Sequence, residues 1–276
     1  MDRRCILIIA IVGAALLSVL SFIIPKNAGS VYSSVMQPLV LLLGFTLAFK
    51  VALNYGRELR KSFLFLSLFL LLYMISNILS LWLFLYSSLG NTKTLYLIQI
   101  LQIACYAMVL TSCAYTLKVI EVKRINRYGW IFIGLLVPLC LFMLIRNLPT
   151  MNAISANPTT EILRLLITIF DMAIILMLAP VVILYIQHLR SKAKESITFT
   201  LIMGGLIFSI ISTYIFELTT GLSLDKIAAD YFQKGSVLDA IYIFGYCIIA
   251  VGLYGNIKYS EWGYQAIVKA LSSKET

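Results

Sequence analysis

The stretch ILRLLITIFDMAIILMLAPVVILYIQ, residues 162–187, decides the fold class of this chain. It carries only two charged side chains, Arg164 and Asp171, and it exceeds the roughly 20 apolar residues that cross a bilayer as a helix. The chain has other apolar segments of this kind, and none shows the alternation of a membrane β-barrel. We therefore predict an all-α integral membrane protein, an eight-helix transmembrane bundle. The predicted spans are residues 5–24, 34–53, 63–88, 95–118, 128–146, 162–187, 196–218 and 236–257.

The composition supports the same class. Hydrophobic residues make up 61% of the 276 residues and charged residues only 12%. A soluble domain carries about 25% charged residues, so this chain lacks the polarity to cover a surface that faces water. In lipid the backbone must satisfy its own hydrogen bonds, which favours helices.

The first apolar segment has two interpretations. It follows Arg3 and Arg4, as the h-region of a signal peptide does. However, it exceeds the usual h-region of about 7–15 residues, and no A-x-A-like cleavage site precedes Pro25. We expect a retained membrane helix.

The net charge of +10 comes from basic residues that are concentrated at the termini and in every second loop. The alternate loops carry only Lys26, Lys93, Lys226 and Lys234. The positive-inside rule then predicts a plasma-membrane protein with both termini in the cytoplasm. Topology explains the charge, so no nucleic-acid partner is expected. The basic residues of the termini and of every second loop include Arg3, Arg4, Arg57, Arg60, Lys61, Lys123, Arg124, Arg127, Arg190, Lys192, Lys194, Lys258, Lys269 and Lys274.

An internal duplication is one interpretation of the chain. Residues 95–121 align without gaps to residues 235–261, so that Tyr106 matches Tyr246 and Lys118 matches Lys258. Two four-helix units, 1–124 and 125–276, would then be parallel and related by a pseudo-twofold axis along the membrane normal. The alternative is a chance match, because apolar segments use few residue types.

Asp171 is the clearest candidate site residue. It lies nine residues into its span, about 13 Å along the axis and therefore near the bilayer midplane. An ionisable group there is a functional hypothesis by default. The alternatives are a proton, cation or ligand site, and a structural hydrogen bond between helices.

An outer polar pocket is a second hypothesis. Arg164 precedes Asp171 by two helical turns, and Glu217 and Asp239 flank the last outer loop. Ordinary interfacial anchoring with ion pairs explains the same residues.

Helix 95–118 adds uncharged polarity. Gln99 and Gln102 lie one turn apart, and the duplication pairs them with Asp239 and Tyr242. Tyr246 and its counterpart Tyr106 would then face a shared centre, where a ligand would bind. Hydrogen bonding between helices is the alternative.

Signatures of a cofactor, a metal site or an enzyme are absent. His188 is the only histidine, and the five cysteines are scattered singly without CxxC spacing. The sequence has no GxSxG motif and no HExxH motif. We expect a non-enzymatic protein without a cofactor.

The last apolar segment, DAIYIFGYCIIAVGLYGNIKY (Asp239 to Tyr259), has an acidic start, then Gly245-Tyr246, then Gly252-Leu253. It resembles the last helix of the multi-span membrane modules at the N-termini of prokaryotic sensor kinases. The resemblance implies a sensory or ligand-binding bundle. Those modules usually feed a kinase, PAS or cyclase domain, whereas only a short tail follows here, so the resemblance implies a bundle that signals through partners or not at all.

Three functions remain open. The first is a sensory, ligand-binding or complex-assembly module with a membrane or cytoplasmic protein partner. The second is a small secondary transporter or channel that uses Asp171, with Pro180 as the candidate for a broken helix. The third is a structural anchor subunit of a larger membrane complex, which suits the short loops and sparse polarity.

Overall fold

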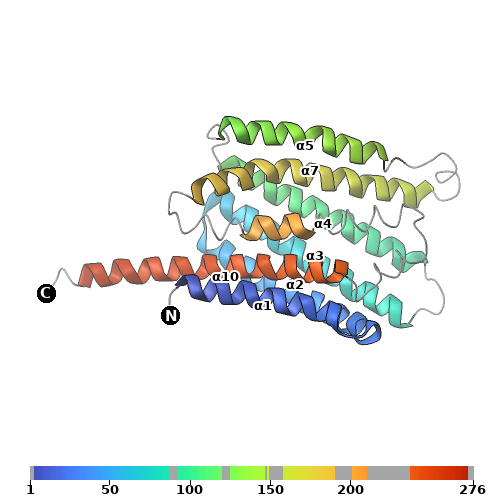
Figure 1. The fold of residues 1–276 in the computed structure, drawn as a ribbon, viewed down its shortest axis with the longest axis horizontal. Coiled ribbons are helices and arrows are strands. Elements are labelled where there is room, and N and C mark those ends of the chain that lie inside the picture. The colour runs from blue at the N-terminus through green and yellow to red at the C-terminus, as the bar shows by residue number, and fades with distance from the viewer. Residues whose placement is uncertain are drawn as a thin grey trace.

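The computed structural model describes residues 3–86, 92–119, 125–146, 148, 158–189, 201–209 and 237–272. Every regular element in these ranges is a helix, and each of the eight predicted ranges contains one (Figure 1). Residues 201–209 are helical as well, and we refer to them as the central segment. The labelled helices are α1 (Arg3–Ile23), α2 (Lys26–Asn54), α3 (Arg57–Tyr86), α4 (Thr92–Val119), α5 (Arg127–Arg146), α7 (Pro158–Leu189) and α10 (Val237–Ser272).

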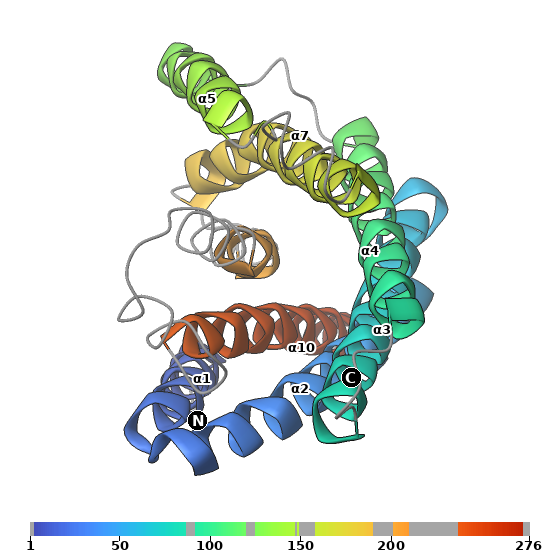
Figure 2. The same ribbon diagram turned by 90° about the vertical axis from the view of Figure 1, so that its right-hand side faces the viewer.

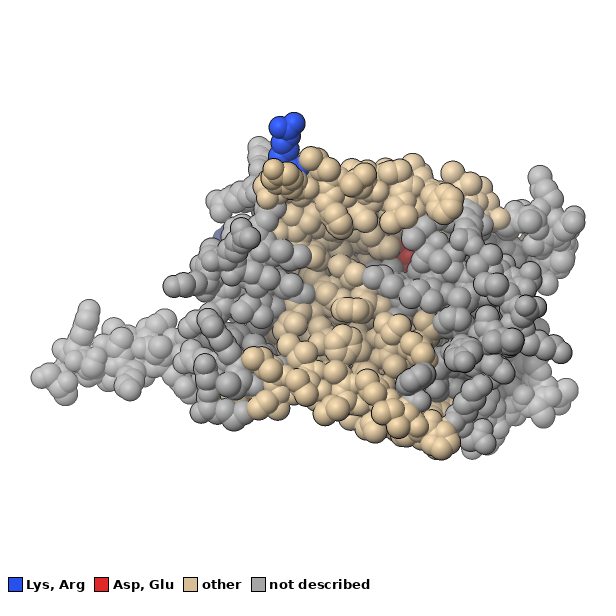
Figure 3. Space-filling model, in the orientation of Figure 1, with Lys and Arg blue, Asp and Glu red and all other residues tan. Residues whose placement is uncertain are grey.

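Five described helices are long and apolar enough to cross a membrane. Helices α1 and α5 hold shorter apolar stretches, Ile8–Ser21 and Arg127–Phe142. The described surface in Figure 3 is almost wholly uncharged, with a basic side chain at its edge. The protein is therefore a helical protein embedded in a membrane. The qualifying spans are Ala28–Asn54, Arg57–Trp82, Leu97–Val119, Leu165–Leu184 and Val237–Lys258.

Viewed end-on, the helices form an open ring around the central segment (Figure 2). The order runs from α5 through α7, α4 and α3 to α2, and α10 packs against both α1 and α2. The central segment lies between α7 and α10. Apolar side chains from most of the ring meet inside it, and the fully buried ones include Leu41, Leu70, Leu178 and Ile249.

Prolines lie both between these helices and inside them. Pro25 ends α1 and begins α2, because its ring removes the backbone donor that a continuous helix needs. Pro180 does not have this effect. Helix α7 runs from Pro158 to Leu189 with Pro180 inside it, so the candidate break at Pro180 is not present. Neighbouring groups in a packed membrane bundle compensate for the freed carbonyl.

Helix α10 is longer than the sequence indicates. The apolar span was expected to end at residue 257, but the helix continues to Ser272 over 36 residues. At 1.5 Å per residue it is about 54 Å long, against about 30 Å for the hydrocarbon core. Its last turns project well beyond the other helices (Figure 1).

A hydroxyl seam joins α3 to α4. Ser62 Oγ lies 2.7 Å from Thr116 Oγ1 and 3.1 Å from Ser112 Oγ. Ser112 Oγ also donates to the backbone carbonyl of Ser62 at 2.9 Å. All three side chains are buried. Small side chains let the two helices approach closely, and their hydroxyls then bond across the interface.

Removing one partner of this seam should weaken the bundle modestly. We expect Ser62→Ala and Ser112→Ala each to cost about 1 kcal/mol, in the range measured for hydrogen bonds between membrane helices. The double variant should cost less than the sum, because the two serines bond each other. Thermal unfolding in mild detergent, arranged as a double-mutant cycle, measures this. Additive losses would contradict the pairing.

Helix α5 begins with a side-chain cap. Asn126 Oδ1 accepts a hydrogen bond from the Gly129 backbone amide at 2.8 Å, which satisfies one of the donors left open at a helix start. We expect Asn126→Ala to cost about 1 kcal/mol, and Asn126→Asp to retain most of the stability. Amide hydrogen exchange along α5 measures the free energy of local unfolding for both variants. Equal losses for the two variants would contradict a capping role.

Candidate functional site

A small cavity lies inside the ring, where α3, α4, α7, α10 and the central segment meet. Its volume is about 40 Å³. A buried water needs about 10–15 Å³, whereas pockets for organic ligands measure about 300–1,000 Å³. The cavity therefore suits a few water molecules or a small ion. The lining residues are Phe69, Tyr73, Cys105, Tyr106, Val109, Ile174, Leu206, Ser209 and Tyr246.

Tyrosine side chains supply the polarity of this cavity. The rings of Tyr73 and Tyr246 are tilted against each other with centroids 5.7 Å apart. Tyr242 stacks on Tyr246 at 6.2 Å. Tyr106 stacks on Phe170 at the same distance. Tyr246 and Tyr106 thus both line this cavity.

Asp171 lies beside this cluster in α7. It is 0% exposed, and Ile174, one turn further along α7, lines the cavity. The residue before it, Phe170, stacks on Tyr106 of the cavity lining. Thr168 is equally buried one turn earlier, so α7 presents a polar stripe on its inner side. A carboxyl group in this position can exchange a proton or hold a cation, and a structural hydrogen bond would need the same burial.

Asp239 links α10 to α2. Its Oδ1 accepts a hydrogen bond from Gln37 Nε2 at 3.0 Å. Among the residues that the structure describes, no group of three His, Cys, Asp or Glu is arranged to hold a metal ion.

The other predicted residues fall in different places. Gln99 and Gln102 are half-buried on α4, and Gln99 Oε1 is shielded but accepts no hydrogen bond from a described residue. Arg164 belongs to α7, but its side chain lies outside the described residues. Glu217 lies outside them altogether, and the proposed meeting of Glu217 with Asp239 remains a prediction.

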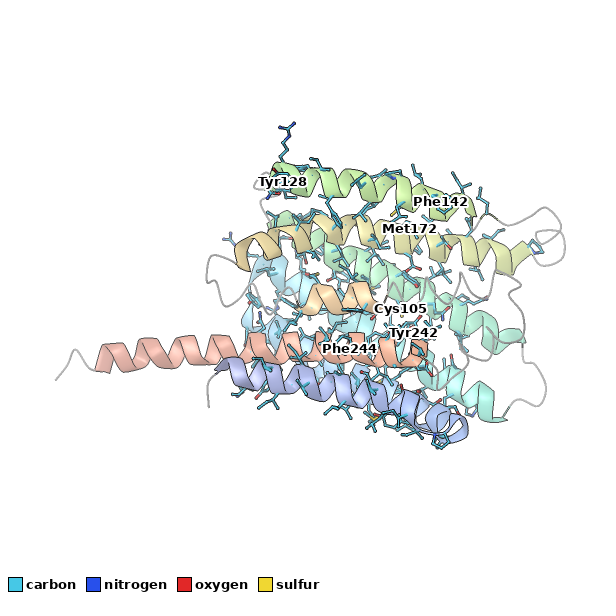
Figure 4. The ribbon with its side chains drawn as sticks, in the orientation of Figure 1. Cys105, Tyr128, Phe142, Met172, Tyr242 and Phe244 are labelled. Carbon is cyan, nitrogen blue, oxygen red and sulfur yellow. The ribbon has the colours of Figure 1, made fainter. Side chains whose placement is uncertain are left out.

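Sequence reasoning missed three contributors to this site. Tyr73 and Ser209 line the cavity, and Gln37 bonds Asp239. Gln37 offered a signal, because it is an amide within an apolar stretch beside Pro38. Tyr73 offered none, since tyrosine is common in membrane helices. Figure 4 shows Cys105 and Tyr242 in the interior, whereas Tyr128 and Phe142 lie on α5 at the edge.

No protein-family model, no curated protein and no solved structure matches this chain. The functional argument therefore depends on the geometry of the site.

Proposed function

We propose that the protein is a sensory module of the plasma membrane, with both termini in the cytoplasm and eight membrane helices. A change in the charge of its buried polar side chains, or in what is bound among them, would move α10 and so alter the contact of α10 with a protein partner. One observation carries this proposal. Tyr246 and Asp239 stand at one end of α10, and the same unbroken helix extends well past the bundle at its other end.

The geometry supports transmission through α10. Asp239 accepts a hydrogen bond from Gln37 of α2, and the Tyr246 ring packs against Tyr73 of α3. A proton or cation that enters the cluster would change both links. The far end of α10 then presents the tail residues 259–272 to the cytoplasm under the predicted topology.

The test is a native purification in mild detergent with mass spectrometry of the proteins that co-purify. The full chain is compared with a chain that ends at Lys258, which keeps every described contact of the α10 span. We expect a stoichiometric partner with the full chain and its loss from the shortened chain. A partner that both chains retain would instead indicate an anchor subunit. The absence of any partner would contradict the proposal.

Transport through the Asp171 site is the second candidate. A buried carboxyl beside a small cavity that tyrosine and serine side chains partly line, within a membrane span, favours it. The small cavity and the continuous α7 argue against a large substrate. Proton flux into liposomes, measured with a pH-sensitive dye, would support transport if the wild type conducts and Asp171→Asn does not. Equal flux for both proteins would exclude Asp171 from transport.

A further inference from the structure

A second and larger hollow lies between α1, α2 and α10, away from the polar cavity. Its volume is about 500 Å³, within the range of ligand pockets. It exists because α1 and α10 line it with small residues, among them Ala10, Gly13 and Ala250. A Cβ atom added at Gly13 would meet nothing within 4 Å. We call this hollow the lateral groove.

The lateral groove is open to the membrane and almost wholly apolar. Leu39 and Leu43 line it and remain 52% exposed. Ordered water needs polar partners, and the lining offers only the hydroxyl of Tyr254 and the thiol of Cys247. Hydrocarbon therefore fills the groove in a bilayer.

The dimensions select a single acyl chain. On α2 the lining runs from Met36 to Leu47, about 17 Å at 1.5 Å per residue, which is close to the depth of one leaflet. A helix of 10 Å diameter and this length has a volume of roughly 1,300 Å³, so a helix from a second copy or another protein would lie mostly outside the groove.

Cations stand at one end of the lateral groove. Lys50 follows Leu47 by three residues on α2, and Lys258 follows Tyr254 by four residues on α10, with its Nζ 5.9 Å from that ring centre. Both helices run toward the same end (Figure 1). At the opposite end Tyr32 donates a hydrogen bond to the Leu17 carbonyl at 2.7 Å, which holds α1 to α2.

We propose that the lateral groove binds one acyl chain of an anionic phospholipid, whose phosphate lies at Lys50 and Lys258. Basic residues between membrane helices bind such headgroups, and the apolar lining holds the chain. The ligand is thus a membrane lipid with a negative headgroup. It would contact α10 directly, but the proposal does not depend on the sensory function.

Native mass spectrometry of the full chain tests this, with phosphatidylglycerol and phosphatidylcholine of identical acyl chains as probes. We expect one retained phosphatidylglycerol per chain and weaker retention of phosphatidylcholine. The double variant Lys50→Gln/Lys258→Gln should bind phosphatidylglycerol about thirty-fold more weakly, since each lysine contributes about five-fold. Lys61→Gln removes the same charge beside Glu58 on α3 and should leave binding unchanged.

Filling the groove tests the acyl-chain site separately. Gly13→Leu should abolish retention of the lipid. Gly134→Leu is the matched control, because a Cβ at Gly134 on α5 also meets nothing within 4 Å. Retention by Gly13→Leu, equal binding of the two lipids, or a homodimer that Gly13→Leu dissociates would each overturn the proposal.

Discussion

Gly205→Ala is expected to destabilise the bundle by about 3 kcal/mol, although it adds a single methyl group. A Cβ at Gly205 would lie 2.5 Å from the Gly245 carbonyl oxygen and 3.0 Å from the Ile249 backbone amide. Backbone atoms cannot move aside as a flexible side chain can. The central segment would have to separate from α10, and the walls of the polar cavity would separate with it.

The neighbouring glycine provides the control. A Cβ at Gly204 meets nothing within 4 Å, so Gly204→Ala should be neutral or should stabilise the helix by up to about 1 kcal/mol. Gly245→Ala, on the other side of the crossing, should resemble Gly205→Ala, because its Cβ would lie 2.9 Å from Ser209 Oγ and 3.0 Å from the Gly205 carbonyl oxygen. Thermal unfolding in mild detergent ranks the three variants. Similar midpoints for Gly204→Ala and Gly205→Ala would refute the close crossing.

Asp171→Lys is expected to prevent folding, with a loss of about 3–5 kcal/mol. The site is 0% exposed and lies within a membrane span, so the ammonium group would be buried away from bulk water. Asp171→Asn preserves the shape and most of the hydrogen-bonding capacity, and should cost about 1 kcal/mol. The yield of monodisperse protein in mild detergent measures both effects.

Asp239 is the matched position for this experiment. It is half-buried near the start of α10, where a lysine side chain can extend toward the interface. Asp239→Lys should therefore retain more folded protein than Asp171→Lys, despite its broken bond to Gln37. If the two lysine variants fold equally well, burial of Asp171 is not the decisive property.

The positions of the helices were predictable because lipid imposes a simple rule on sequence. A span must be apolar and about 20 residues long, and five of the described helices meet this rule at predicted positions. The α10 extension was not predictable in this way. Residues 259–272 are too polar to mark a span, and a helix that continues past the membrane needs no apolar signal.

The site was predictable only in part, for a related reason. Asp171, Asp239 and Tyr246 stood out because polar groups in lipid are costly and therefore rare. Which neighbouring helix they contact depends on how apolar side chains pack, because the helices are apolar on every side. The crossing at Gly205 and Gly245 places Ser209 beside Tyr246, yet the sequence shows only two ordinary glycines.

Because α10 is long and unbroken, a small tilt at one end displaces its other end by a larger distance. From Tyr246 to Ser272 the helix spans about 39 Å, and no proline interrupts this stretch. A helix curves only gently, so a tilt at one end appears at the other in proportion to that distance. A tilt of about 5° around Tyr246 would displace the far tip by roughly 3 Å. Under the proposed function, a small rearrangement among the tyrosines would therefore appear as a movement of several ångströms where α10 is proposed to meet its partner.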